Sequence, residues 1–201
     1  MKTIFIPAKS KLEISIKNLP KLPNKLAIAY SIQFKEQANK VKEILSKSSE
    51  VVSFVQVLGC SRPNFTKSTQ AVILVGQGRF HAIGLAIETN LPIYILEQGE
   101  FHKISSEEVQ NFVKKQTSSL KNFLNSTNVG ILISTKPGQE NMKKAINFKK
   151  TLKNKNSYLY ITNELNISEF ENFPQIQSWV NTACPRMDLD STKIINLNKT
   201  N

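Results

Sequence analysis

Hydrophobic positions along the chain follow two alternating periods. Short segments rich in Val, Ile and Leu predict strands, and between them lie longer segments in which apolar residues recur every three or four positions. The helical period is clearest at 34–46, where one face carries Phe34, Ala38, Val41 and Leu45. The predicted strands are 3–7, 26–32, 51–58, 71–75, 92–96, 129–134, 157–162 and 178–182. The predicted helices are 34–46, 82–88, 105–124, 140–152 and 168–173, and the third of them opens on the capping box Ser105-x-x-Glu108.

This alternation predicts an α/β fold. The strands are apolar at nearly every position, which is typical of parallel sheets covered by helices on both faces. Because the helix predicted at 105–124 is long and a second β-α-β-α-β run follows it, we expect two small Rossmann-like domains, each with a parallel sheet. We place the boundary inside that helix, which gives domains of residues 1–118 and 119–201.

Composition excludes several classes of protein. No window approaches the roughly 18 apolar residues of a membrane helix, and Pro7 and Lys9 end the apolar start of the chain too early for a signal peptide. We therefore expect a cytoplasmic protein without a membrane partner. Two cysteines in 201 residues cannot form a disulfide framework, so Cys60 and Cys184 are expected to be free thiols or ligands.

The charge of the chain raises the hypothesis of a nucleic-acid partner. There are 27 Lys or Arg residues against 15 Asp or Glu, which gives a formal net charge of +12. The basic residues are spread along predicted surfaces without the interleaved aromatic residues that stack on bases, so we expect no specific nucleic-acid binding. Only three of them are arginines: Arg62, Arg79 and Arg186. In a lysine-rich chain these indicate positions where a planar, bidentate donor is needed.

Four loops follow the predicted carboxyl ends of strands, where open parallel sheets bind ligands. Their sequences are LGCSRP at 58–63, GQGRFH at 76–81, TKPGQ at 135–139 and TACPR at 182–186. Cys60 and Cys184 each lie two residues before an arginine, and nearby cations favour the thiolate form. They are candidates to converge on one ligand, against the alternative that each is a small buried apolar side chain.

The glycines of these loops have two interpretations. Gly76 and Gly78 would present backbone N–H groups at the head of a helix to a carboxylate or phosphate, and Gly138 would do the same after Thr135 and Lys136. The alternative in each case is a plain tight turn without a ligand.

The two histidines do not indicate a metal site. His81 is expected to be structural, and His102 is expected to be exposed in a polar loop. A zinc site built from them and the cysteines is disfavoured, because the sequence has no short ligand pair such as C-x-x-C.

Taken together, the four loops resemble the diphthamide-synthesis family, the archaeal and eukaryotic enzymes that make 2-(3-amino-3-carboxypropyl)histidine on elongation factor 2. The matching stretches are QVLGC at 56–60, VGQGRFHAIG at 75–84, GILISTKPGQ at 130–139 and VNTACPRMDLD at 180–190. The resemblance covers essentially the whole chain in the right order, and the combination of TACPR with GxGxFH is specific.

The resemblance implies a cofactor and a reaction. Family members hold a [4Fe-4S] cluster with three cysteines, one from each of three similar α/β domains, and leave the fourth iron open for S-adenosylmethionine. An electron from the cluster cleaves S-adenosylmethionine, and the 3-amino-3-carboxypropyl radical attacks the histidine ring. By this resemblance the chain takes part in diphthamide biosynthesis as a transferase, with elongation factor 2 as its protein substrate.

Carried over residue by residue, Cys60 and Cys184 match the cluster ligands of the middle and last domains. The chain begins where the family's middle domain begins, so the first domain and its cysteine are not in this sequence, and Ser61 stands where an acidic residue commonly follows the cysteine. We therefore expect a partial or partner-dependent subunit, in a homodimer or heterodimer, whose third thiolate comes from a separately encoded domain or a partner. An incomplete reading frame is the alternative.

The remaining candidate residues are assigned by this resemblance to S-adenosylmethionine. Arg79 or Arg186 is expected to clamp the carboxylate of the methionine moiety, and the glycine turn and the 135–139 loop are expected to shape its pocket. The predicted cofactor-binding set is Gly76, Gly78, Arg79, Thr135, Lys136, Gly138, Gln139 and Arg186. The alternative function is that of a non-catalytic accessory subunit of the same complex, or of an inactive remnant.

Overall fold

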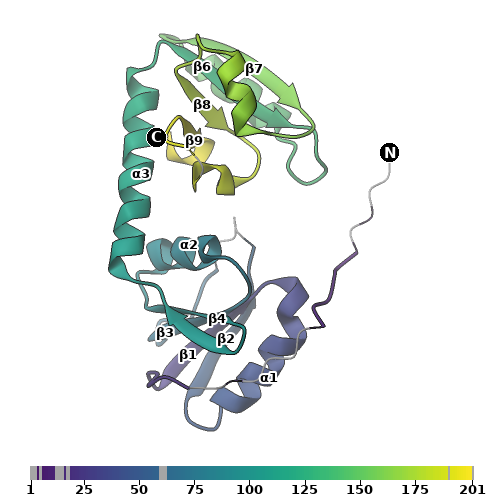
Figure 1. Ribbon diagram of the computed structural model, residues 1–201, viewed down its shortest axis with the longest axis vertical. Helices are drawn as coiled ribbons and strands as arrows, with labels where there is room; N and C mark the ends of the chain where they lie inside the picture. The colour runs from purple at the N-terminus through teal and green to yellow at the C-terminus, as the bar shows by residue number, and fades with distance from the viewer. Residues whose placement is uncertain are drawn as a thin grey trace. The chain divides into compact units, whose positions relative to one another are not determined.

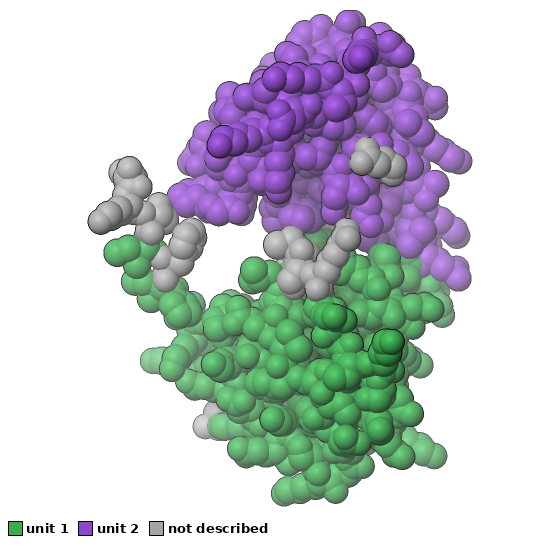
Figure 2. Space-filling model, turned by 180° about the vertical axis from the view of Figure 1, so that it is seen from behind, with its two compact units in different colours: residues 1–109 green, residues 110–201 purple. Residues whose placement is uncertain are grey.

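The chain forms two compact units, Met1–Val109 and Gln110–Asn201, which Figure 2 distinguishes by colour. The computed structural model describes residues 4, 6–11, 16, 19–58, 63–189 and 191–200. The division between the units falls within the long helix α3 (Ser106–Asn125), the helix in which the sequence places the boundary. No helix in the described ranges has the length and apolar character needed to cross a membrane.

Unit 1 is built on a five-stranded sheet in the order β2-β1-β3-β4-β5 (Figure 1). Its strands are β1 (Lys25–Tyr30), β2 (Glu50–Gln56), β3 (Ala71–Val75), β4 (Ile93–Glu97) and β5 (Glu100–Lys103). Its helices are α1 (Lys35–Leu45), preceded by the 3-10 turn η1 (Ile32–Phe34), and α2 (Arg79–Thr89). The first four strands are parallel, and β5 runs antiparallel to β4.

Burial on both faces of this sheet explains why its central strands, β1 and β3, are apolar at nearly every position. Ile28 of β1 packs in one cluster with Val41 of α1, whereas the next residue, Ala29, packs in a second cluster with Leu85 of α2. Successive side chains of a strand point to opposite faces, so two helix-covered faces leave no polar position in a central strand. The α/β fold predicted from the apolar runs is confirmed in this unit.

Two differences from the predicted elements occur in unit 1. Of the strand predicted at 3–7, the described residues Ile4, Ile6 and Pro7 lie in no strand, and both isoleucines are exposed. Their apolar pattern therefore does not bury them against the sheet. The hydrophobic pattern also did not indicate β5, which follows β4 through Gln98 and Gly99 with φ of 50° and 85°. Two consecutive positive φ values are typical of a type I′ hairpin turn.

Unit 2 is built on a parallel sheet in the order β7-β6-β8-β9 (Figure 1). Its strands are β6 (Asn128–Ser134), β7 (Asn156–Thr162), β8 (Ser178–Asn181) and β9 (Ile194–Asn196). Helices α3 and α4 (Met142–Thr151) cover one face. The other face is covered by 3-10 segments, of which η2 (Ile167–Asn172) and η3 (Pro185–Leu189) contribute Phe170 and Met187. A further 3-10 turn, η4 (Leu197–Lys199), follows β9.

The capping box predicted at the start of α3 is present. The Ser105 hydroxyl accepts a hydrogen bond from the Glu108 backbone N–H at 3.2 Å, and the Glu108 carboxylate accepts one from the Ser105 backbone N–H at 2.9 Å. The Glu108 carboxylate also pairs with the Arg79 guanidinium. The Ser105 backbone hydrogen bond, aided by the Ser105 hydroxyl and Arg79, lowers the pKa of the Glu108 carboxyl from its usual value of 4.5.

Glu108→Ala is expected to destabilise the protein in a pH-dependent way. A carboxyl whose folded-state pKa is lowered stabilises the fold fully above its unfolded pKa, and that contribution is lost as pH falls through the folded value. The variant should therefore lose about 1 kcal/mol in the free energy of unfolding at neutral pH, as for loss of a helix cap, and less as the pH falls below 4.5. Urea titrations at neutral pH and at a pH below 4.5 measure the free energy of unfolding of the variant and the parent. Glu107→Ala, the exposed neighbour, is the control, and an equal loss in the two variants would contradict the assignment.

Candidate functional site at the carboxyl ends of the two sheets

Each sheet reverses its strand order once, between two neighbouring strands at its centre. In unit 1 this point lies between β1 and β3, and in unit 2 it lies between β6 and β8. Ligands of open α/β sheets bind in the crevice at the carboxyl ends of such strands. Three of the four predicted loops follow these strands, the 76–81 loop in unit 1 and the 135–139 and 182–186 loops in unit 2.

The glycine turn of unit 1 is occupied by the protein's own carboxylates. Gly76 is buried beside Ser31, whose Oγ would lie 3.4 Å from a Cβ at this glycine. Gly78 has a φ of 89° and leads directly into α2, and its N–H donates to Glu97 Oε1 at 3.1 Å. The helix therefore begins at Arg79 and not at Ala82, because the positive φ of the glycine turns the chain into the first helical residue.

Arg79 is exposed, and its guanidinium pairs with Glu108 as described above. The two donors that the sequence assigns to a ligand carboxylate in this loop, the Gly78 N–H and the Arg79 guanidinium, thus both contact carboxylates of unit 1. The chemistry of the turn suits a carboxylate, and a ligand at this position would have to compete with Glu97 and Glu108.

The cysteine loop of unit 1 follows β2. The strand ends at Gln56, close to the end predicted from the sequence, and Val57 is buried while Leu58 is exposed. Cys60 and Arg62 lie outside the described residues, and the role of Cys60 as a cluster ligand stays a prediction.

The 135–139 loop of unit 2 is a tight turn that ends before α4. The Gln139 N–H donates to the Lys136 carbonyl at 3.0 Å, with Pro137 and Gly138 between them and a φ of 81° at Gly138. Proline followed by a positive-φ glycine is the signature of a type II turn. Gly138 is thus required by the turn itself. The loop is further tied to the end of β7, since the Thr135 N–H donates to the Thr162 carbonyl at 2.9 Å.

The side chains of this loop point to neighbouring polar groups. Lys136 Nζ lies 3.1 Å from Glu164 Oε1, and the Thr135 hydroxyl is 3.3 Å from Asn163 Oδ1. Gln139 is half-buried, and its carbonyl accepts a hydrogen bond from the Asn141 side chain at 3.3 Å.

Asn141 joins this loop to the second cysteine loop. Its Nδ2 also donates to the Thr182 carbonyl at 2.8 Å. Thr182 is buried and bonds to β6 twice, since its N–H and its hydroxyl both donate to the Leu132 carbonyl, at 3.2 and 2.7 Å. The structure therefore brings the 135–139 loop and the 182–186 loop together at the point where the strand order of unit 2 reverses.

Two buried asparagines hold the loop that carries Cys184. Asn181 Nδ2 donates to the Cys184 carbonyl at 2.7 Å and to Asn196 Oδ1 at 2.7 Å, and Asn181 Oδ1 accepts from the Ala183 N–H at 2.9 Å. Asn196 Nδ2 in turn donates to the Pro185 carbonyl at 2.8 Å. These bonds fix the backbone on both sides of Cys184, whose half-buried side chain forms no disulfide.

Arg186 is exposed and has no carboxylate partner within the described parts of the chain. It therefore differs from Arg79, which is paired. Among the described residues, no group of three or more His, Cys, Asp or Glu side chains is arranged to hold a metal ion.

Both histidines lie in unit 1, on α2 and β5. His81 is half-buried on α2, with its ring centroid 5.7 Å from that of Phe80. His102 lies on β5 and not in a loop, with 42% of its side chain exposed and Glu100 at 4.0 Å.

Sequence reasoning missed the residues that position the loops. Asn141, Asn181 and Asn196 carry the hydrogen bonds described above, yet a single asparagine at a strand end has no periodic signal. A signal was present only for Asn181, which lies in the VNTACPR stretch at the residue where β8 ends.

Comparisons with known proteins find relatives that match nearly the whole chain. The family model described as "Putative diphthamide synthesis protein" matches residues 1–194. A 2-(3-amino-3-carboxypropyl)histidine synthase from Pyrococcus horikoshii is 26% identical over 206 residues, covering 94% of this chain and 60% of the relative. One from Methanocaldococcus jannaschii is 30% identical, with 94% and 57% covered. Subunit 1 of the Schizosaccharomyces pombe enzyme is 28% identical, with 93% and 48% covered.

Solved structures show the same relationship. The crystal structure of Dph2 from Pyrococcus horikoshii superposes with a TM-score of 0.76 at 26% identity, covering 89% of this chain and 56% of that one. A second crystal structure of the same protein contains a 4Fe-4S cluster and gives the same agreement. The chain spans about half to three fifths of the length of these relatives. Because the family model matches nearly the whole length of this chain, the chain belongs to the diphthamide-synthesis family.

Proposed function

We propose that the chain takes part in diphthamide biosynthesis as a partial or partner-dependent subunit of a 3-amino-3-carboxypropyl transferase. In this proposal Cys60 and Cys184 bind a [4Fe-4S] cluster, S-adenosylmethionine is the co-substrate, and a histidine of elongation factor 2 is the acceptor. The observation that carries the proposal is the placement of Cys184 on a rigid loop at the strand-order reversal of unit 2, in a chain of this family.

The loop around Cys184 suits a cluster ligand. The thiol is half-buried, so it is accessible to iron yet shielded in part from water, and Asn181 and Asn196 hold its backbone in place. A backbone held in this way positions the thiolate before the metal binds, so the loop does not have to fold around the metal. When bound, the cluster would supply the electron that cleaves S-adenosylmethionine. The second ligand, Cys60, is proposed on the resemblance of its loop.

By the resemblance, the cluster takes three cysteine ligands, of which Cys60 and Cys184 would supply two. In this proposal the third comes from a partner, either a separately encoded first domain or another subunit, within a homodimer or heterodimer. The curated fungal relative is named as subunit 1 of its synthase, which supports assembly with a further chain. The competing function is that of a non-catalytic accessory subunit that uses the same fold without a cluster of its own.

Electron paramagnetic resonance of the anaerobically reconstituted, dithionite-reduced protein tests the proposal. A [4Fe-4S] signal is expected in the parent chain and should be lost in Cys60→Ala and in Cys184→Ala. Because a half-ligated cluster is labile, the measurement is repeated with a co-expressed partner that carries the first domain. Absence of the signal from both preparations would favour the accessory function.

Arg186→Lys is expected to weaken binding of S-adenosylmethionine to the reconstituted protein about tenfold. A guanidinium contacts a carboxylate through two parallel hydrogen bonds, and an ammonium cannot reproduce that geometry. Arg186 is assigned this role over Arg79, because Arg79 is paired with Glu108. Calorimetric titration of the two matched variants, Arg186→Lys and Arg79→Lys, measures the difference. Unchanged affinity in Arg186→Lys would remove the role.

A further inference from the structure

One face of the unit 2 sheet is covered incompletely and contains a hollow. Helices cover the opposite face, but this one is closed by η2 and η3, which are short 3-10 segments. An inner chamber of about 240 Å³ remains, and an outer hollow of about 520 Å³ adjoins it. The two share Glu164, Leu165, Asn166 and Glu169. We refer to both together as the aromatic-acidic hollow.

Aromatic rings form the wall of the inner chamber. The only tryptophan of the chain, Trp179 on β8, is stacked on Phe170 at 4.4 Å between ring centroids, and Tyr160 meets it edge-on at 4.6 Å. Phe173 lies edge-on to Tyr160 at 4.7 Å. Burial raises the pKa of the Tyr160 hydroxyl, and the neighbouring Tyr158 raises it further. Trp179 itself is only 1% exposed, so the rings that a cation would meet in this chamber are the half-buried rings of Tyr160, Phe170 and Phe173. The faces of aromatic rings attract cations through their quadrupoles.

Carboxylates stand beside these rings in a chain whose net charge is +12. Both Glu164 and Glu169 line the inner chamber and the outer hollow. Glu164 already holds a cation, since Lys136 Nζ lies 3.1 Å from its Oε1. Glu169 makes no ion pair with any described residue. One negative charge of the hollow is therefore left for a ligand.

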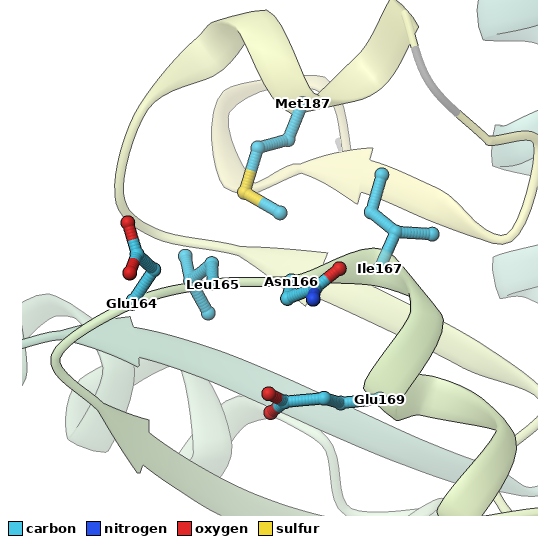
Figure 3. A pocket seen from close by; sticks show the side chains of 6 residues that line it. All are labelled: Glu164, Leu165, Asn166, Ile167, Glu169 and Met187. Carbon is cyan, nitrogen blue, oxygen red and sulfur yellow. The ribbon is translucent and has the colours of Figure 1, made fainter.

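Besides the polar residues Glu164, Asn166 and Glu169, the outer hollow is lined by the aliphatic side chains of Leu165, Ile167 and Met187. Figure 3 shows Met187 projecting from η3 on one side, and Leu165, Asn166 and Ile167 along the segment that follows β7 on the other. An aliphatic stem fits between such side chains, while its charged end reaches the carboxylates and rings of the inner chamber.

We propose that the aromatic-acidic hollow is the docking site for an arginine side chain presented by a partner protein. The inner chamber is smaller than the roughly 300–1,000 Å³ of pockets that enclose a drug-sized ligand, so it suits the charged end of one side chain, whose stem would lie in the outer hollow. A planar guanidinium stacks on rings and bonds to a carboxylate at the same time, which an ammonium does less well. The proposal concerns unit 2 alone and does not depend on the cluster, so its failure leaves the proposed function untouched.

Fluorescence of Trp179 provides the test, because it is the single tryptophan and lines the chamber. The full chain is titrated at constant ionic strength with the peptide acetyl-Gly-Arg-Gly-amide. The matched probe contains citrulline, which has the shape of arginine without the charge. We expect a saturable change in emission with the arginine peptide and affinity at least about tenfold lower for the citrulline peptide.

Two variants distinguish binding inside the hollow from general electrostatic attraction to the surface. Glu169→Gln is expected to weaken binding of the arginine peptide about tenfold. Glu171→Gln removes the same charge from an exposed position on η2 that does not line the hollow, and it should bind as the parent does. Circular dichroism checks that both variants fold. Equal binding of the two peptides, equal effects of the two variants, or no saturable change with the arginine peptide would each overturn the proposal.

Discussion

Gly130→Ala is expected to destabilise unit 2 by about 3 kcal/mol, the upper end of what overpacking a core usually costs. Gly130 lies on β6 directly beside Trp179 on β8. A Cβ at this position would come within 2.3 Å of Trp179 Cε3 and 2.4 Å of Cζ3, far inside any van der Waals contact. The indole cannot move aside easily, since Phe170 is stacked on it and Tyr160 meets its edge.

Thermal unfolding followed by circular dichroism measures this effect, and Trp179 emission reports it for unit 2 specifically. Gly84→Ala is the matched control. A Cβ at Gly84 would meet no atom within 4 Å, and the position lies inside helix α2. Alanine should therefore stabilise the chain by about 0.5–1 kcal/mol through its higher helix propensity. Similar changes in the two variants would show that the indole does not lie over Gly130 as described.

Asn181→Ala is expected to cost about 2–4 kcal/mol in the free energy of unfolding. The substitution removes three hydrogen bonds of a side chain that is 2% exposed. It also leaves the Cys184 carbonyl and Asn196 Oδ1 without this donor in a buried place, and each unsatisfied buried group costs roughly 1–3 kcal/mol. Asn147→Ala on the exposed surface of α4 is the control and should stay within about 0.5 kcal/mol of the parent.

A chemical readout distinguishes the loop from general stability. In a Cys60→Ala background Cys184 is the single thiol, and its reaction with a disulfide reagent reports access to the loop. We expect Asn181→Ala to react several-fold faster than Asn147→Ala under native conditions, because the backbone on both sides of Cys184 is released. Equal rates would mean that Asn181 stabilises the fold without holding the cysteine.

The predictability of each element follows from where its side chains lie. β3 was predicted at its exact bounds because all five of its residues are buried, and a short uninterrupted apolar run is typical of a strand covered on both faces. In β5, apolar and polar residues alternate only weakly. The turn before it places Gln98 at a positive φ, a position that asparagine or aspartate more often occupies. β9 is three residues long, too short for any period to be seen.

The candidate site was predictable only in its loops. The rule that parallel sheets bind ligands at their carboxyl ends identified the 135–139 and 182–186 loops as candidates, and in the structure Asn141 joins them through its hydrogen bonds. The partners of Gly78 and Arg79 could not be foreseen, because Glu97 and Glu108 lie 19 and 29 residues further along the chain. Such contacts depend on how the sheet and helices pack, and a linear pattern does not encode them.

The position of β7 has a consequence for the protein at high concentration. It is an edge strand of its sheet, and it exposes Tyr158 and Ile161 by 46% and 55%. A free edge with apolar side chains is a template for strand pairing between molecules, the first step of aggregation. Lys153 and Lys155 precede this strand, and flanking charges of this kind act as gatekeepers. The lysine excess thus opposes non-specific pairing of this edge between copies of the chain by mutual repulsion.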